Sequence, residues 1–136
     1  MTQLPLHSTS KLPPPNAFAS SLPIVHKATE AYKLWNGFLD TFPRLSRFTL
    51  GIKIDTVFTE TIELLFLAGY TSKPQKLLIV QRAATKLDAL KFFLNIAWEL
   101  KALDNKKYIR LSEPLVEVGK MLGGWRKQLE SNTPAE

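Results

Sequence analysis

The chain has 136 residues, a length typical of a single domain that can bury its own hydrophobic core. It contains no cysteine, which excludes disulfide bonds, thiolate metal sites and a cysteine nucleophile. Eighteen Lys and Arg residues against twelve Asp and Glu give a formal net charge of +6, which favours a polyanionic partner. No apolar run reaches the roughly 20 residues that a membrane span needs, so we expect no membrane partner and a cytoplasmic protein.

The two ends of the chain differ in composition from its middle. Residues 1–22 hold four of the nine prolines, including Pro13-Pro14-Pro15, and are expected to form a disordered or loosely attached arm. Residues 131–136 are polar and contain Pro134, so this tail is expected to fray. The predicted folded domain is therefore 23–130.

Apolar residues at a spacing of three and four predict two helices in the first half of this domain. Helix one is expected over 23–41, with Pro23 in its first turn and Pro43 ending it. Helix two is expected over about 45–69, with Gly69 as a left-handed cap.

Two more helices are expected in the second half. Helix three is predicted over about 72–103, because Ser72 and Gln75 have the spacing of a capping box. Asp104 is a good N-cap for helix four, about 105–130, which leaves almost no loop between these two helices and favours an antiparallel hairpin. The predicted fold is all-α, an up-down-up-down four-helix bundle.

Helix four carries the most regular apolar stripe of the sequence. Its members are Tyr108, Leu111, Leu115, Val118, Leu122, Trp125 and Leu129. Pro114 lies inside this stripe and is expected to kink the helix without breaking it. Gly123 and Gly124 also interrupt it, and either the helix continues and the glycines let another backbone approach, or Gly123 caps it and Trp125 begins a tail.

Glycines elsewhere allow the same two interpretations, close helix packing or a tolerated weak position. The candidates for a packing role are Gly51, Gly119, Gly123, Gly124 and Trp125.

We expect no catalytic or metal site and no cofactor. Gly119-Lys120 lacks the residues of a phosphate loop, no metalloprotease or hydrolase motif occurs, and two histidines leave little for acid–base chemistry.

The positive charge is unevenly distributed. From Lys73 to Lys127 there are twelve basic and five acidic residues. The candidates for phosphate contacts are Arg44, Arg47, Lys53, Lys76, Arg82 and Lys86. Because most aromatic residues lie on the core stripes, we expect contacts to phosphates rather than stacking on bases. A solvated helical surface is the alternative. Apolar residues off the stripe of helix three favour a homo-oligomer.

Two segments resemble a known family. Arg47-Phe-Thr-Leu-Gly-Ile-Lys-Ile54 resembles the start of helix two in the accessory variability determinant (Avd) proteins, and Gly119-Lys-Met-Leu-Gly-Gly-Trp-Arg126 resembles their GRMLGGW segment. The opening Leu22-Pro-Ile24 and the pair Gly69-Tyr70 also fit, so the resemblance covers about residues 22–130.

The resemblance implies a four-helix bundle that assembles as a ring-like homopentamer with a basic surface. It also implies a non-catalytic partner of diversity-generating retroelements, which binds the reverse transcriptase and the template RNA and is required for error-prone cDNA synthesis. From the basic clusters we expect binding of structured RNA and, less selectively, of DNA. The alternatives are a four-helix protein of the ribosomal-RNA intervening-sequence type with a structural or adaptor role, and a small helical chaperone for an acidic partner. A neighbouring reverse transcriptase gene with template and variable repeats would distinguish them.

Overall fold

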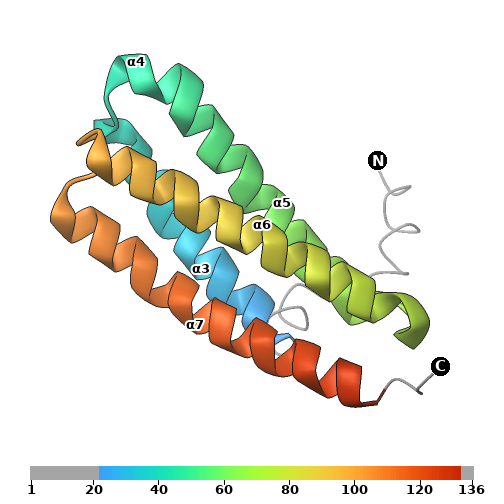
Figure 1. Cartoon of the computed structure of the whole chain (residues 1–136). Helices are drawn as coiled ribbons and strands as arrows, with labels where there is room; N and C mark the ends of the chain where they lie inside the picture. The colour runs from blue at the N-terminus through green and yellow to red at the C-terminus, as the bar shows by residue number, and fades with distance from the viewer. Residues whose placement is uncertain (1–21, 133–136) are drawn as a thin grey trace, which may run out of the picture.

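The computed structural model describes residues 22–132, which are helical except for short connections (Figure 1). Its four long helices are α3 (Pro23–Phe38), α5 (Ile52–Tyr70), α6 (Lys73–Glu99) and α7 (Asn105–Ser131). Helices α3 and α6 each pack against both α5 and α7, so the four helices surround one core. The predicted all-helical class is confirmed for the described residues, and consecutive long helices run in opposite directions (Figure 1).

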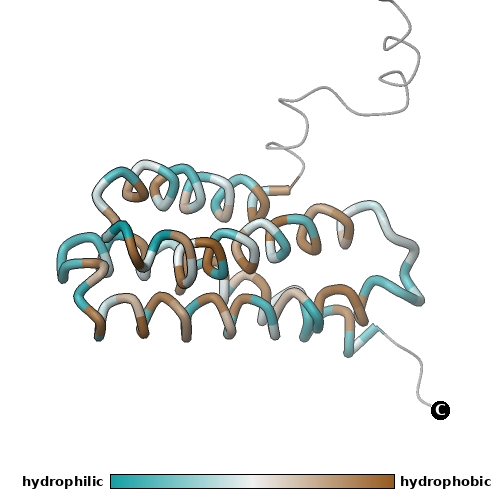
Figure 2. Tube along the Cα trace, turned by 90° about the horizontal axis from the view of Figure 1, so that it is seen from above, coloured by the Kyte–Doolittle hydropathy of each residue, from teal (hydrophilic) through white to brown (hydrophobic). Residues whose placement is uncertain are grey.

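The core is built from the predicted stripes. Apolar and polar segments follow one another along the helices (Figure 2), and every long helix contributes buried apolar side chains to the core. On α7, Leu111, Leu115, Val118 and Leu122 are buried. Tyr108, Trp125 and Leu129 pack against them from partly buried positions. The largest fully buried side chains of the bundle include Trp35, Phe42, Phe58, Ile54, Leu65, Leu90 and Leu94.

Helix α7 runs without a break through both features that the sequence left open. It contains Pro114, and its buried residues keep their register on both sides of the proline. It also continues through Gly123 and Gly124 to Ser131, so the alternative in which Gly123 caps the helix is wrong. Asp104 is the N-cap as predicted, and its Oδ1 accepts a hydrogen bond from the backbone N–H of Lys107 at 2.8 Å.

The start of helix two differs from the regular helix that was predicted. The short α4 (Arg44–Ser46) leads into a π-helical stretch, η2 (Arg47–Gly51), before α5 begins. Phe42, in the connection before α4, is buried and makes an edge contact with Trp35 at 5.5 Å between ring centroids. A side-chain carbon at Gly51 would lie 3.5 Å from the Ser46 carbonyl oxygen and 3.6 Å from the Phe42 ring, which are ordinary contact distances, so the packing role of Gly51 stays a prediction. The π-helical stretch η2 therefore ends next to the connection that contains Phe42.

The prediction that Gly69 is a left-handed cap is wrong. Helix α5 continues to Tyr70, and no glycine among residues 22–132 has a positive φ. Gly69 instead makes room for Leu22, since a side-chain carbon added to this glycine would approach the Leu22 Cδ2 to 3.0 Å. Apart from Leu22, the predicted arm 1–22 lies outside the described residues, as does the predicted tail from residue 133 onwards.

The two ends of α6 also differ in detail from the prediction. Ser72 precedes the helix as expected, but it makes no capping hydrogen bond to the backbone. Its hydroxyl lies 3.5 Å from the side-chain oxygen of Gln75, so the capping box does not form. At the other end, α6 stops at Glu99 rather than at about residue 103.

Lys101 is the reason that α6 ends early. It adopts a φ of 65°, the only positive φ of a non-glycine residue among residues 22–132. The backbone N–H of Ala102 donates to the Ala97 carbonyl at 2.8 Å and that of Lys101 to the Trp98 carbonyl at 3.0 Å. This is a Schellman motif, which usually places a glycine where this chain has Lys101.

We expect Lys101→Gly to stabilise the bundle by about 0.5–1 kcal/mol, because glycine enters the left-handed region without the steric cost that a side chain carries. Urea denaturation followed by circular dichroism measures the change. Lys101→Ala removes the same charge and keeps the strain, so it is the matched control. If the urea midpoint rises equally in both variants, the gain in stability comes from the loss of the charge and not from the backbone conformation.

Candidate nucleic-acid interface

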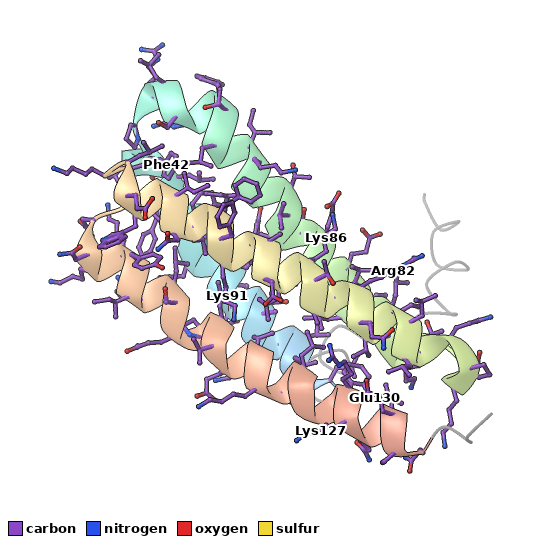
Figure 3. The ribbon with its side chains drawn as sticks, in the orientation of Figure 1. Phe42, Arg82, Lys86, Lys91, Lys127 and Glu130 are labelled. Carbon is purple, nitrogen blue, oxygen red and sulfur yellow. The ribbon has the colours of Figure 1, made fainter. Side chains whose placement is uncertain are left out.

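Three of the six basic residues predicted to contact phosphates lie around the contact between α5 and α6. Arg82 and Lys86 project from the same side of α6 (Figure 3). They line a shallow groove together with Glu60 and Glu63 of α5. Lys53 lies nearby, with its Nζ 5.6 Å from the centroid of the Phe93 ring. This part of the surface therefore mixes both signs of charge and is less basic than α6 alone indicates.

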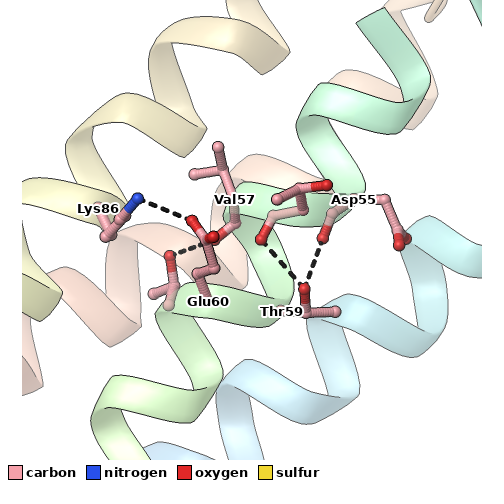
Figure 4. A network of polar contacts seen from close by, with 7 residues as sticks. Asp55, Val57, Thr59, Glu60 and Lys86 are labelled. Atoms are coloured by element: carbon pink, nitrogen blue, oxygen red, sulfur yellow. Dashed lines mark hydrogen bonds and ion pairs between the residues drawn. The ribbon is translucent and has the colours of Figure 1, made fainter. Parts of the chain in front are cut away.

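One ion pair dominates the groove. The Lys86 Nζ lies 2.7 Å from the Glu60 Oε1, and both side chains are about two-fifths exposed (Figure 4). The hydrogen bond and the charge of Lys86 lower the pKa of the Glu60 carboxyl, and Lys53 adds a smaller effect in the same direction. Lys86 is thus already partnered within the subunit, and a phosphate would have to compete with a carboxylate for it.

The Glu60 pair predicts a pH dependence with a definite sign. Because the pKa of Glu60 is lowered in the folded state, the pair stabilises the bundle at neutral pH, and this contribution is lost as the pH falls through the folded-state pKa. We expect carboxyl-carbon NMR titration to give Glu60 a pKa below its ordinary value, and Lys86→Met to return it upward. A Glu60 pKa that is unchanged in Lys86→Met would contradict the assignment.

The remaining predicted residues lie apart from this groove. The Arg47 guanidinium donates through its Nη2 to the carbonyls of Asp40 and Phe42 at 3.3 and 3.0 Å, and its Nε is buried without a hydrogen-bond partner. Arg47 thus ties the connection before α4 to the start of helix two. The Arg44 side chain is exposed and forms no hydrogen bond or ion pair within residues 22–132, and Lys76 lies in the first turn of α6. Their nucleic-acid role stays a prediction.

Sequence reasoning missed a second place where cations gather. Lys107 and Arg110, in the first two turns of α7, both lie beside the ring of Phe38 in α3. The spacing of Lys107 and Arg110, three residues apart, indicates one helix face, but Phe38 lies 69 and 72 positions before them along the chain.

The sequence reasoning also missed Asp55. Its Oδ1 accepts hydrogen bonds from the Tyr32 hydroxyl at 2.8 Å and the Trp35 indole N–H at 3.1 Å.

The glycines of α7 fall into two kinds. A side-chain carbon at Gly119 would lie 3.6 Å from both the Leu87 Cδ2 and the Lys91 Nζ, so this glycine faces α6 at contact distance. At Gly123 and Gly124 such a carbon would meet nothing within 4 Å. Among residues 22–132, therefore, no backbone makes the close approach predicted for this pair.

The described residues contain no group of three or more His, Cys, Asp or Glu side chains able to hold a metal ion. Within the same residues, no helix is both long and apolar enough to cross a membrane.

Comparison with known families gives a match over nearly the whole bundle. The model of the bAvd-like family matches residues 24–129, from the first turn of α3 to the last turn of α7. The chain belongs to the bAvd-like family. The resemblance to Avd proteins that the sequence motifs indicated is thereby confirmed. No curated protein matches the chain.

Membership in the bAvd-like family suggests an accessory protein of diversity-generating retroelements, a non-catalytic type of protein. The two motifs that carried the resemblance occupy distinct positions in this structure. The segment Arg47–Gly51 is the π-helical stretch η2. The segment 119–126 is the part of α7 where one glycine faces α6 and two others are open.

Proposed function

We propose that this protein is the accessory subunit of a diversity-generating retroelement, which binds the reverse transcriptase and the template RNA and supports mutagenic cDNA synthesis. The observation that carries the proposal is the family match, because it covers all four helices rather than one motif. The absence of cysteine suits work in a reducing cytoplasm.

The charge of the chain supports the RNA part of the proposal. A net charge of +6 attracts a polyanion, and the buried positions of Trp35 and Phe58 leave these rings unavailable for base stacking. Binding through phosphates makes affinity depend strongly on salt and weakly on sequence. Template RNA is therefore held by charge, with DNA bound less selectively.

The apolar surface supports assembly into a homo-oligomer, for which we propose the ring-like pentamer of the Avd type. Leu45, Phe48 and Phe92 are 88%, 66% and 61% exposed, and Ile52 is 55% exposed. Large exposed apolar side chains of this kind mark interaction surfaces. In a ring, basic groups repeat around the assembly, so weak contacts from single subunits add up to avidity for a long RNA.

Substitutions at Gly124 test whether another subunit packs against this position, Gly124→Ala through stability and Gly124→Leu through oligomer mass. Within residues 22–132 the added methyl meets no atom beyond its own helix backbone within 4 Å, so the gain in helix propensity should stabilise the subunit by up to about 1 kcal/mol. If another chain packs on this position, Gly124→Leu should lower the oligomer mass measured by multi-angle light scattering. Wild type that scatters as a monomer at micromolar concentration would contradict the proposed assembly.

Co-purification tests the partner assignment. The protein is co-expressed with a tagged reverse transcriptase from a diversity-generating retroelement, with and without its template RNA, and the complex is sized after affinity capture. We expect a stable complex that survives nuclease treatment. Failure to capture this protein under any condition would favour the intervening-sequence type of four-helix protein with a structural or adaptor role.

A further inference from the structure

Two cations of α7 converge on one ring at an end of the bundle. The Lys107 Nζ lies 5.6 Å and the Arg110 Cζ lies 5.5 Å from the centroid of the Phe38 ring. Phe38 is the last residue of α3 and is buried. Both cations thus lie where α3 leads into α4 and α6 turns into α7, at the same end of the molecule (Figure 1).

Neither cation is neutralised there. The ion pairs of residues 22–132 are Lys33–Glu30, Lys86–Glu60 and Arg126–Glu130, none of which involves Lys107 or Arg110. The nearest acids along the chain are Asp104 and Glu113, and Asp40 lies on the turn that follows Phe38; none of the three forms an ion pair within residues 22–132, and Glu113 is exposed. Asp104 caps the helix by accepting from the backbone N–H of Lys107, and Asp40 is exposed on the 3-10 turn η1 (Leu39–Thr41).

Both side chains keep hydrogen-bond donors to spare. The Lys107 ammonium has three donors, and its only acceptor among the described residues is the Thr41 hydroxyl oxygen. The Arg110 guanidinium has five donors and forms no hydrogen bond or ion pair within residues 22–132; the ring of Phe38 beside it accepts no conventional hydrogen bond. Two like charges held beside one ring repel each other, and an anion placed between them would remove that repulsion.

We propose that Lys107, held by the Thr41 hydroxyl oxygen, and Arg110 form a phosphate site that holds the sugar–phosphate backbone of a bound nucleic acid. A guanidinium matches two phosphate oxygens with parallel hydrogen bonds, and the ammonium can donate to another. The Thr41 hydroxyl donates its one proton to the Phe38 carbonyl oxygen at 3.2 Å, so it positions Lys107 as an acceptor and does not itself donate to the phosphate. The apolar ring beneath them orients the cations without competing for the anion. The proposal rests on the proposed RNA-binding function and assigns it to residues outside the six predicted from the sequence.

The test uses the full chain and a fluorescein-labelled single-stranded RNA, with anisotropy measured across a salt series. The double variant Lys107→Gln/Arg110→Gln removes both charges and keeps side chains of similar shape. The control is Lys120→Gln/Lys127→Gln, which removes two charges from the same helix away from this end. We expect the first variant to bind on the order of tenfold more weakly at 0.1 M salt and to reduce the slope of log affinity against log salt by about 1.4, since each single-strand contact contributes about 0.7.

The outcomes separate this site from the function on which it rests. Equal losses in the two double variants would overturn the site and leave only a general effect of net charge. Arg110→Lys, which keeps the charge, should recover most of the salt slope. If wild type binds no RNA, the proposed function fails, and titration with inorganic phosphate then decides the site alone: a phosphate-dependent shift of the Arg110 Nε NMR signal supports it, and an unchanged signal overturns it. Circular dichroism melts confirm that each variant folds.

Discussion

Phe42→Ala should destabilise the bundle by about 3–5 kcal/mol, the cost typical of removing a buried aromatic side chain. Phe42 is 2% exposed and is the residue directly after η1. Its ring contacts Trp35 of α3 and lies next to Gly51 at the end of η2. Little can collapse into the space, because the neighbours are another large ring and a glycine backbone. Urea denaturation followed by circular dichroism should show a much lower midpoint.

Phe42→Leu is the matched control, since it keeps an apolar side chain of intermediate size and should lose a smaller part of the stability. A Phe42→Ala protein with wild-type stability would mean that the connection around Arg44 rearranges freely, contrary to the packing described for this end. An altered slope of the denaturation curve would instead indicate a change in the compactness of one of the two states.

Asp55→Ala should cost about 2–3 kcal/mol, because it removes the common acceptor of two donors from α3. The Trp35 side chain is fully buried, so its indole N–H, now 3.1 Å from the Asp55 Oδ1, would lose its partner without access to water. The Tyr32 hydroxyl, at 2.8 Å from the same oxygen, would lose its partner too. The measurement is again the free energy of unfolding in urea.

Asp55→Asn keeps an acceptor oxygen without the charge and should recover about half of the lost stability. Burial is the main cause that raises the pKa of the Tyr32 phenol, followed by the hydrogen bond to Asp55 and its charge. Ultraviolet titration of Asp55→Ala should therefore show the Tyr32 pKa shifting partly back toward its ordinary value. An unchanged tyrosine titration together with unchanged stability would contradict the described contact between α3 and α5.

The long helices could be predicted because their signals are local. The stripe of α7 keeps its spacing through Pro114 and Gly123, and the buried Leu111, Leu115 and Val118 are the residues that the period selects. The end of α6 could not be placed, because the left-handed residue of its Schellman motif is Lys101 and carries no glycine signal. The π-helical stretch η2, whose last residue Gly51 lies next to Phe42, is also marked by no local pattern of the sequence.

The candidate site was predicted less completely, because it depends on which helices become neighbours. Arg82 and Lys86 could be placed on one face of a helix from their spacing, but Glu60 comes from α5 and neutralises Lys86 across the interface. Arg47 looked like a free surface base and instead donates to two carbonyl groups of the preceding connection. Conversely, the sequence did not indicate that Lys107 and Arg110 would lie beside one ring, because Phe38 comes from α3.

The central claim is that this protein supports mutagenic cDNA synthesis as an accessory subunit. The most direct measurement is a reconstituted reaction in which a diversity-generating retroelement's reverse transcriptase copies its template RNA, and the cDNA is quantified and sequenced. The account predicts that full-length, error-prone cDNA appears only when this protein is present, and that Lys107→Gln/Arg110→Gln reduces its yield at moderate salt. Equal amounts of cDNA with the same error rate in the presence and absence of the protein would contradict it.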